Sequence, residues 1–303
     1  MDIRLSDDGA VYGWTEDWTQ TPSPHEASAG WAHHGLAVTR AGQILSFHPE
    51  RPEVLIFGPD GSLQGSFATG LFEGHGLTLV DDGAADGGAG ESVWVADPGS
   101  KMRRTEGGRY EADTSEHGAV VRFSLDGQAL QRLERPPHPA YDSTHRYAPT
   151  FVAVDEVRHG GSGDVWVADG YGQSLVHRFR ADGSYVATID GSEGPAGRFN
   201  CPHAIFIDRR GPEPRLLVAD RGNGRIQAYD LDGRWDRLIG AEYLNSPSAF
   251  AVDGDNLVVA ELFARLAVIS PTDELLGYLG ENGEVCAEPG WPNALDEHDN
   301  QVR

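Results

Sequence analysis

Apolar residues fall in short runs along this chain, and Gly, Asp and Pro stand between the runs. The runs are about five residues long and rich in Val, Ile, Leu and aromatic side chains, a pattern typical of strands joined by turns rather than of amphipathic helices. The same order returns five times: a strand led by His, Thr or Ser, a strand ending in His48 or an acidic residue, a third strand, and an Asp-Gly-like turn. We therefore expect an all-β protein built from an internal repeat.

The spacing of the repeats sets the size of the unit. The first strands of the five copies begin at His34, His75, Thr150, His203 and Ser248. These positions are 41, 75, 53 and 45 residues apart, which gives a core unit of about 40 to 45 residues, the length of a propeller blade. The second copy is long because it carries insertions near 101–118 and 134–148. The prediction is a β-propeller with five recognisable four-stranded blades.

The repeat also divides the chain. Residues 1–30 are expected to form an N-terminal segment, 31–280 the propeller domain, and 281–303 a tail or the start of a sixth blade. No further His-led repeat follows Gly280. The chain is therefore expected to be a shortened form of a longer protein, or a propeller that is five-bladed or open.

Charge and composition exclude some partners. The formal net charge is −23, whereas nucleic acids and anionic membranes bind basic surfaces. We therefore expect neither partner, and the start of the chain lacks the basic and apolar regions of a secretion signal. Cys201 and Cys286 are the two cysteines and have no CxxC spacing, so we expect reduced thiols in a cytoplasmic protein. The oligomeric state stays open.

The residues that lead the first strands are the first candidates for chemistry. The innermost strand of each blade lines the channel of a propeller, so these five residues are expected to form a ring. Three imidazoles with one open position are typical of a catalytic zinc site, and His75 and His203 lie two blades apart. We predict these two as ligands of zinc or another divalent transition metal and His34 as a substrate contact. The alternative is that each His caps a turn or packs in the channel without metal.

A second set of polar residues ends the second strands: His48, Asp97, Asp169, Asp220 and Glu261. Carboxylates at such positions commonly hold the adjoining turn by accepting backbone N–H groups, although His48 and Asp169 are also candidates for substrate contact. Tyr171 and Arg221 follow directly after this set and could supply a proton-transfer group and a carboxylate clamp. Their alternatives are a surface aromatic residue and a solvated arginine.

Four stretches carry a family resemblance: Val165-Trp-Val-Ala-Asp-Gly-Tyr-Gly-Gln-Ser174, Arg198-Phe-Asn-Cys-Pro-His203, Leu217-Val-Ala-Asp-Arg-Gly-Asn-Gly-Arg-Ile-Gln227 and Val259-Ala-Glu-Leu262. With them, the chain resembles the peptidyl-α-hydroxyglycine α-amidating lyases, which belong to the six-bladed NHL-repeat propellers. The resemblance covers residues 30–280 and is most specific over 165–229.

The resemblance implies a lyase that breaks the C–N bond of a carbinolamide and releases an amide and glyoxylate. Carried over by position, His75 and His203 would be two of three histidine ligands of the metal. Tyr171 would be the general base and Arg221 would bind the substrate carboxylate. A structural calcium on the channel axis would include Leu77 among its carbonyl ligands.

Two departures from the family pattern change what is expected of the substrate and the metal. Where the family has Phe-His-Arg, this chain reads Phe47-His48-Pro49-Glu50-Arg51. Either Arg51 takes the arginine's role two residues later or the substrate differs, and we favour a different small-molecule substrate. The family's third histidine lies on a sixth blade, and His298 in the polar tail is a poor substitute.

Alternatives remain for a loop and for the function. The loop 136–147 could fold over the channel mouth as a lid, with Tyr147 or His145 touching substrate, or it could be an ordinary surface loop. The function is either a metal-dependent lyase acting on a small carbinolamide or related hydroxy acid, or a non-catalytic propeller that presents its rim to a protein or ligand. A calcium-dependent lactonase would need acidic and Asn ligands in the channel, whereas the positions expected there in this chain are rich in histidine.

Overall fold

The computed structural model describes residues 2–4, 11–13, 15, 18–23, 27, 34–81, 90–104, 110–262 and 264–287. Its contacts divide the chain into two units. The first unit comprises Asp17–Arg104 and Tyr110–Asp190, and the second comprises Met1–Glu16, Thr105–Arg109 and Gly191–Arg303. Most of the predicted N-terminal segment, the end of the predicted tail and His298 lie outside the described residues, and the three-part division of the chain stays a prediction.

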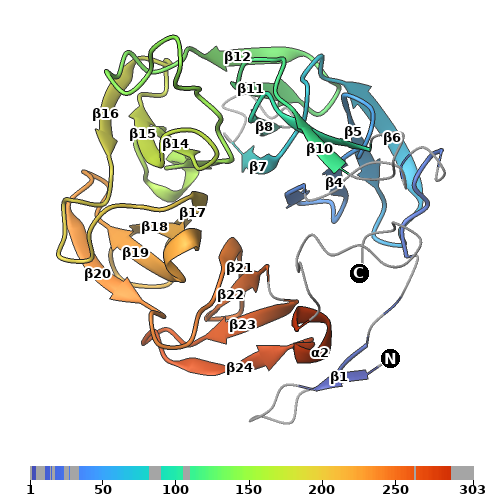
Figure 1. Ribbon diagram of the computed structural model, residues 1–303. Helices are drawn as coiled ribbons and strands as arrows, with labels where there is room; N and C mark the ends of the chain where they lie inside the picture. The colour runs from blue at the N-terminus through green and yellow to red at the C-terminus, as the bar shows by residue number, and fades with distance from the viewer. Residues whose placement is uncertain are drawn as a thin grey trace. The chain divides into compact units, whose positions relative to one another are not determined.

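Five four-stranded antiparallel sheets confirm the all-β class and the predicted blades (Figure 1). In the first unit, blade one contains β3 Leu36–Val38, β4 Ile44–Phe47, β5 Glu53–Phe57 and β6 Leu63–Ala68; blade two contains β7 Gly76–Asp81, β8 Glu91–Asp97, β11 Ala119–Ser124 and β12 Ala129–Leu133; blade three contains β13 Phe151–Val154, β14 Val165–Asp169, β15 Leu175–Phe179 and β16 Tyr185–Ile189. In the second unit, blade four contains β17 Pro202–Asp208, β18 Arg215–Asp220, β19 Arg225–Tyr229 and β20 Trp235–Ile239; blade five contains β21 Pro247–Asp253, β22 Asn256–Glu261, β23 Arg265–Ile269 and β24 Leu275–Leu279.

Burial explains why the four strands of a blade differ in sequence. The second strands β8, β14 and β18 bury nearly every residue, so they read as continuous apolar runs that end in a carboxylate. The fourth strands β12, β16 and β20 expose much of their length and accordingly mix polar with apolar residues. The second strands therefore carry the side chains that the blades bury most deeply.

The Asp-Gly-like turn has a structural cause. In every blade the register between the third and fourth strands shifts just before the turn. The turn then needs a residue with positive φ, which glycine adopts at little cost. Gly127, Gly183 and Gly233 have φ of 89°, 87° and 83°, and Asp273 takes the place in blade five with φ of 65°.

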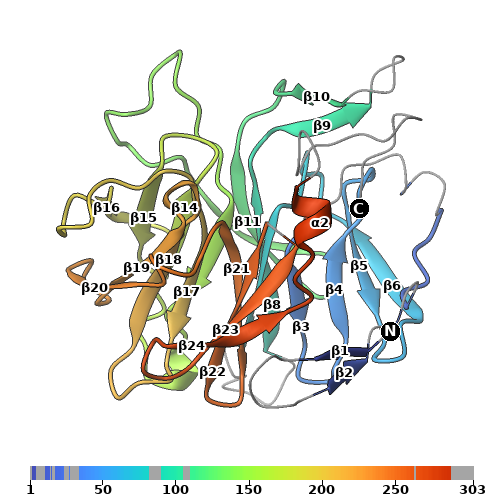
Figure 2. The ribbon, with the colours of Figure 1, turned by 60° about the horizontal axis from the view of Figure 1, so that its bottom comes forward.

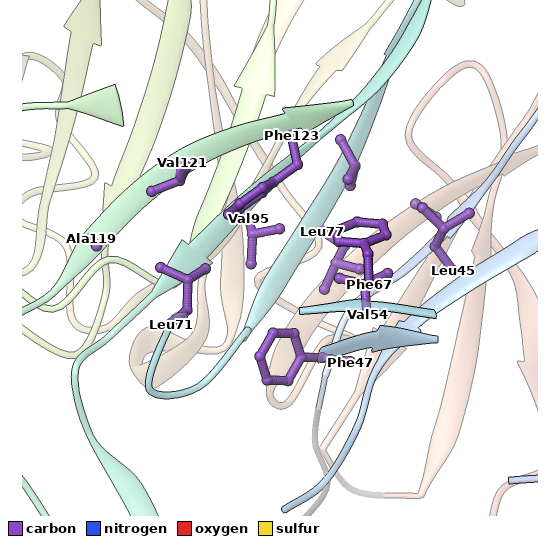
Figure 3. Packing of buried hydrophobic residues seen from close by; sticks show 12 residues of the cluster. Leu45, Phe47, Val54, Phe67, Leu71, Leu77, Val95, Ala119, Val121 and Phe123 are labelled. Carbon is purple, nitrogen blue, oxygen red and sulfur yellow. The ribbon is translucent and has the colours of Figure 1, made fainter. Parts of the chain in front are cut away.

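Blades one and two share a core in the first unit (Figure 3). Phe47 and Val54 of blade one pack with Leu77, Val95 and other buried apolar side chains of blade two. A Cβ on Gly74 would lie 2.1 Å from the Phe47 ring. Only glycine therefore fits in front of β7.

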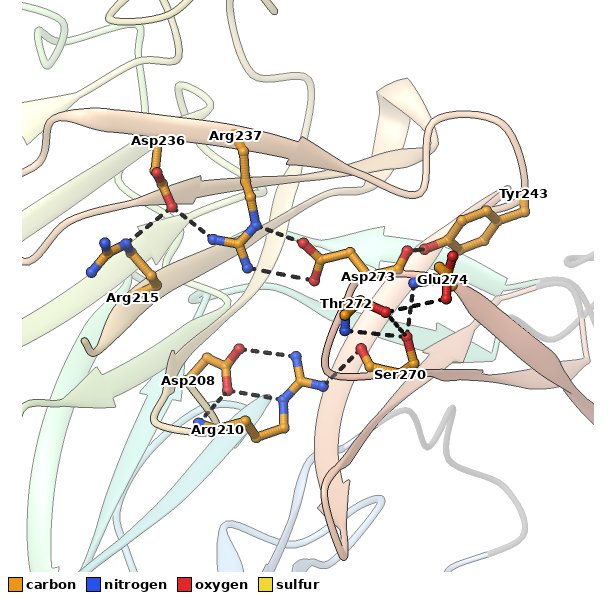
Figure 4. Close-up of polar contacts among 10 residues, drawn as sticks. All are labelled: Asp208, Arg210, Arg215, Asp236, Arg237, Tyr243, Ser270, Thr272, Asp273 and Glu274. Atoms are coloured by element: carbon orange, nitrogen blue, oxygen red, sulfur yellow. Dashed lines mark hydrogen bonds and ion pairs between the residues drawn. The ribbon is translucent and has the colours of Figure 1, made fainter. Parts of the chain in front are cut away.

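Polar bonds join blades four and five in the second unit (Figure 4). Arg237 of β20 pairs with Asp273 at 2.6 Å, and the Tyr243 hydroxyl donates to the Asp273 carbonyl at 2.7 Å. Arg210, paired with Asp208 within blade four at 2.9 Å, also donates to the Ser270 carbonyl of blade five at 3.3 Å. Beside these bonds, an apolar cluster that includes Leu217, Ile226, Val259 and Ile269 fills the space between the two sheets.

The predicted insertion near 101–118 is confirmed as a ribbon of β9 Lys101–Arg104 and β10 Tyr110–Asp113, which extends beyond β8 and β11 (Figure 2). A second two-stranded sheet pairs β1 Asp2–Arg4 with β2 Val11–Gly13. The helical segments Val157–His159, Arg221–Asn223 and α2 Gly283–Cys286 are short. Among the described residues, no helix has the length and apolar character to cross a membrane.

Candidate functional site

The first strands of successive blades lie next to one another within each unit. In the first unit, β7 contacts β3 on one side and β13 on the other, and the Thr78 hydroxyl donates to the Val152 carbonyl at 2.6 Å. In the second unit, β17 contacts β21. The residues that lead these strands are therefore close to the neighbouring blade of the same unit, as the ring prediction requires.

His75 stands just before β7 and is held from both sides. Its backbone N–H donates to the Ala96 carbonyl of β8 at 2.8 Å. Its ring Nδ1 lies 2.9 Å from the Thr150 carbonyl of blade three. A carbonyl oxygen can only accept, so Nδ1 carries the hydrogen and Nε2 of the neutral ring carries the lone pair.

Tyr171 meets this lone pair. Its hydroxyl lies 3.1 Å from His75 Nε2, and the two rings meet edge-on with centroids 5.0 Å apart. His75 is 2% exposed and Tyr171 is 36% exposed, so a buried acceptor faces a hydroxyl that solvent or a small molecule can reach. Sequence positions 96 residues apart thus form one acid–base pair.

His203 of the second unit is anchored in the same way. Its Nδ1 lies 2.7 Å from the Ser248 carbonyl of blade five, so its Nε2 also carries the lone pair of the neutral ring. His203 lies where the register between β17 and β18 shifts, whereas His75 precedes a regular strand. Both histidines therefore present the same tautomer from different local backbones.

Arg221 lies beside the segment that leads into His203. Its backbone N–H donates to the Cys201 carbonyl at 3.2 Å, and its Nη2 donates to the Cys201 sulfur at 3.1 Å. Cys201 has φ of 55°, and burial raises the pKa of its thiol. The structure thus brings Arg221 to the residues before His203 and Tyr171 to His75.

The acidic ends of the second strands hold loops, as expected. Asp97 accepts from the backbone of Phe72, Glu73 and Gly99. Asp220 accepts from Asn200, Asn223, Arg225 and Gln227. Glu261 accepts from Asn245, Ser246 and Arg265. Blades two, four and five therefore each use one buried carboxylate to fix the adjoining loops.

No family model matches the chain. It is 29% identical to human NHL repeat-containing protein 3 over 245 residues, which cover 76% of this chain and 61% of that protein. It is 26% identical to a probable peptidyl-alpha-hydroxyglycine alpha-amidating lyase of Caenorhabditis elegans over 221 residues, 64% of this chain and 54% of that protein.

The chain is a homologue of NHL-repeat proteins and of an amidating lyase. It spans about 60% of the human relative's length. Among solved structures it resembles that of streptogramin B lyase, with a TM-score of 0.56 and 13% identity, covering 90% of this chain and 72% of that chain. This likeness supports the propeller fold.

The other candidates of blade one take part in local contacts in this NHL-repeat homologue. His34 packs edge-on against Phe47, with ring centroids 5.6 Å apart. His48 is fully buried, and its Nδ1 accepts from the backbone of Glu50 and Arg51 at 3.0 Å. The Arg51 guanidinium pairs with Glu53 at 3.1 Å. His48 thus fixes the turn that carries Arg51.

Three of the remaining candidates, Leu77, Tyr147 and Asp169, are buried, whereas His145 is exposed. Tyr147 is 5% exposed and Asp169 is fully buried. Leu77 lies in β7 and its side chain belongs to the core shared by blades one and two. His145, on the same loop as Tyr147, is exposed and bonds Asp142 at 2.9 Å.

Sequence reasoning missed Tyr141 and His177. His177 lies in the third strand of blade three, in the middle of an apolar run, and Gln227 occupies the same place in blade four. Both positions serve the acid of the second strand: Gln227 reaches Asp220 directly at 3.1 Å, and His177 reaches Asp169 through Tyr141. A polar residue at this point of the repeat was the signal that could have found them.

Within the described residues, no group of three or more His, Cys, Asp or Glu side chains is arranged to hold a metal ion. The fit of a metal therefore rests on the individual donors. Both His75 and His203 have Nδ1 bonded to a carbonyl and the lone pair on Nε2, the arrangement by which proteins orient metal-binding imidazoles. The donor chemistry suits zinc and its neighbours.

Proposed function

We propose that this protein is a metal-dependent carbon–nitrogen lyase that acts on a small carbinolamide or a related hydroxy acid. The observation that carries the proposal is the pair formed by the half-exposed Tyr171 hydroxyl and His75 Nε2, 3.1 Å apart. Homology to a probable amidating lyase supports it. A hydroxyl held against an imidazole is suited to moving a proton at a bound substrate.

The reaction is an elimination whose atoms balance within the substrate. Tyr171, as its phenolate, takes the proton of the substrate hydroxyl and passes it to the departing nitrogen. The electron pair of that O–H bond forms a carbonyl as the C–N bond breaks, and the departing nitrogen takes a proton to leave as an amide. With a 2-hydroxyglycine derivative the second product is glyoxylate, and no oxidant or water is consumed.

Arg221 would bind the carboxylate of such a substrate. A guanidinium recognises a carboxylate through its planar fork of N–H donors, and Nη2 of Arg221 donates to the Cys201 sulfur at 3.1 Å. The bond from the Arg221 backbone to Cys201 fixes the start of the side chain. An arginine held at both ends loses less side-chain freedom when it binds an anion.

The metal would be held by His75 and His203, as the family resemblance implies. A bound divalent ion would supply Lewis-acid polarisation of a substrate oxygen. A cation held at His75 Nε2 would lie beside the Tyr171 oxygen, 3.1 Å from this nitrogen, and would favour the phenolate that acts as the base. Tyr171 would then be available to the substrate.

Elemental analysis of protein purified without chelators, combined with a glyoxylate-release assay on an N-acyl-2-hydroxyglycine, tests the proposal. We expect near one equivalent of a transition metal in the wild type and near none in His75→Ala. His159→Ala is the control, because His159 is an exposed histidine of the same unit and should leave the metal in place.

The outcome that would overturn the proposal is wild-type protein with neither metal nor glyoxylate release. That result would favour the alternative of a non-catalytic NHL-type scaffold that binds a protein or ligand on its rim. Metal without glyoxylate release would retain the metal site and reject this substrate.

A further inference from the structure

The loop 136–147, a candidate lid on its sequence, is bonded to blades two and three. Arg146 Nη2 donates to the carbonyls of Gly99 at 2.7 Å and Glu116 at 2.9 Å. Gln173 donates its side-chain N–H to the Arg146 carbonyl at 3.2 Å. These bonds hold the loop in place beside the turn that carries Tyr171.

A buried tyrosine on this loop links it to blade three. The Tyr141 oxygen lies 2.7 Å from Asp169 Oδ2 and 2.6 Å from His177 Nε2. Burial raises the pKa of Asp169 to about 6, so the carboxylate is ionised at neutral pH and can only accept. Tyr141 therefore donates its one hydrogen to Asp169 and accepts the hydrogen of His177 Nε2.

The far side of the imidazole completes the order of hydrogens. His177 Nδ1 lies 2.8 Å from the Thr188 hydroxyl, which lies 2.8 Å from the Tyr185 hydroxyl. Burial lowers the pKa of His177 to about 3, so the ring is neutral and Nδ1 accepts from Thr188. Thr188 in turn accepts from Tyr185. Every hydrogen in this chain then points towards Asp169.

Asp169 closes the turn that holds Tyr171. Its carboxylate accepts from the backbone N–H of Ala148 and of Gln173, both at 2.6 Å. A Cβ on Gly172 would lie 2.1 Å from the carboxylate, so the turn is wrapped tightly around it. The Tyr171 backbone also donates to the Ala148 carbonyl at 3.3 Å.

We propose that the hydrogen-bonded chain through Tyr141 and His177 is a positioning device, which fixes the Asp169–Gln173 turn and so sets the Tyr171 hydroxyl against His75. The catalytic role of this device rests on the proposed function. Blade four, where Gln227 bonds Asp220 directly, does without a tyrosine from the preceding loop. Blade three therefore has an extra linkage at the turn that bears the candidate base.

The test is Tyr141→Phe, which keeps the buried ring and removes the donor to Asp169. The Tyr171 ring resonance in protein labelled with ¹³C-tyrosine, assigned by its loss in Tyr171→Phe, reports on the contact with the edge-on His75 ring. We expect this resonance to move. The Ala148 and Gln173 amides should exchange about tenfold faster, the factor for one lost hydrogen bond of ordinary strength.

The control is Tyr147→Phe. Tyr147 is buried in the same apolar cluster as Tyr141, and its hydroxyl has no hydrogen-bond partner in the part of the chain that the structure describes. Its loss should leave the Tyr171 resonance and both amides unchanged. If Tyr141→Phe fails to fold, Thr188→Val breaks the chain from its other end with the same shape of side chain, and the same changes are expected on a smaller scale.

An unmoved Tyr171 resonance with unchanged amide exchange in both Tyr141→Phe and Thr188→Val would overturn the positioning role. This readout needs no turnover, so it stands even if the lyase proposal fails. Where glyoxylate release is measurable, Tyr141→Phe should lower kcat about tenfold with KM nearly unchanged, because a misplaced catalytic group weakens the transition state more than substrate binding.

Discussion

The two units hold histidines that are anchored alike but accompanied differently. His75 and His203 each have Nδ1 bonded to a carbonyl at the start of the next blade, at 2.9 and 2.7 Å. Beside His75 stands a tyrosine hydroxyl, whereas the segment before His203 holds the Cys201–Arg221 contact. The bond from Nδ1 to the next blade thus fixes the tautomer of each histidine, and the loop after the second strand carries the side chain that could react.

This division explains how one repeat can carry different chemistry on neighbouring blades. The anchoring bonds run to backbone carbonyls at the start of the next blade, those of Thr150 and Ser248. Tyr171 and Arg221 come from positions directly after the buried acids Asp169 and Asp220, where the chain leaves the sheet and side chains are exchanged at little cost to the core.

Tyr171→Phe should have the largest effect on turnover, because it changes the contact at His75 and leaves the surroundings of His203 as they are. Removing the hydroxyl beside His75 removes the proposed base, so turnover should fall about 10²- to 10⁴-fold, the contribution of a positioned proton-transfer group. Metal content, measured in the same preparation, should stay near that of the wild type. Retained turnover would show that the tyrosine merely packs on His75.

Arg221→Gln should act on binding rather than on the chemical step. Loss of a charged contact to the substrate carboxylate should raise KM about tenfold to a hundredfold, with kcat less affected. Steady-state kinetics would measure both constants. Arg234→Gln is the control, because Arg234 is an exposed arginine of the same blade, paired with Asp230 and Asp232. Equal effects of the two changes would remove Arg221 from the site.

His177→Gln makes blade three resemble blade four, and its effect should depend on pH. Burial, followed by the charge of His138, lowers the pKa of His177 to about 3 from its ordinary 6.5. Between these values the unfolded chain binds the proton that the folded chain excludes. The contribution of His177 to stability is therefore present at neutral pH and lost as pH falls below about 6.5.

The measurement is the free energy of unfolding in urea at several pH values for both proteins. The excess stability of the wild type over His177→Gln should shrink from pH 7.5 to pH 4. Asp169, whose pKa burial raises to about 6 from 3.8, changes stability in the opposite direction, and it is present in both proteins. A difference that does not vary with pH would contradict the buried, neutral state of His177.

Much of the fold could be predicted because the repeat can be recognised from short stretches of sequence. Spacing and composition alone showed the strand runs, the acids that end the second strands and the insertion near 101–118. In the part of the chain that the structure describes, the helical segments are short, because turns such as those at Gly127 and Gly183 separate short strands. The candidate site was partly visible, since Tyr171 and Arg221 follow the repeat's acids.

Local patterns in the chain were enough to locate the strands and turns and the residue types that lead and end them, because an apolar run and a turn of positive φ depend on a few neighbouring residues. Packing between distant segments fixes which nitrogen of His75 carries the hydrogen, places Tyr171 at the other nitrogen, and brings Tyr141 and His177 to Asp169. Those contacts join residues 28 to 96 positions apart in the sequence, and their geometry comes from how the sheets and the loop 136–147 pack.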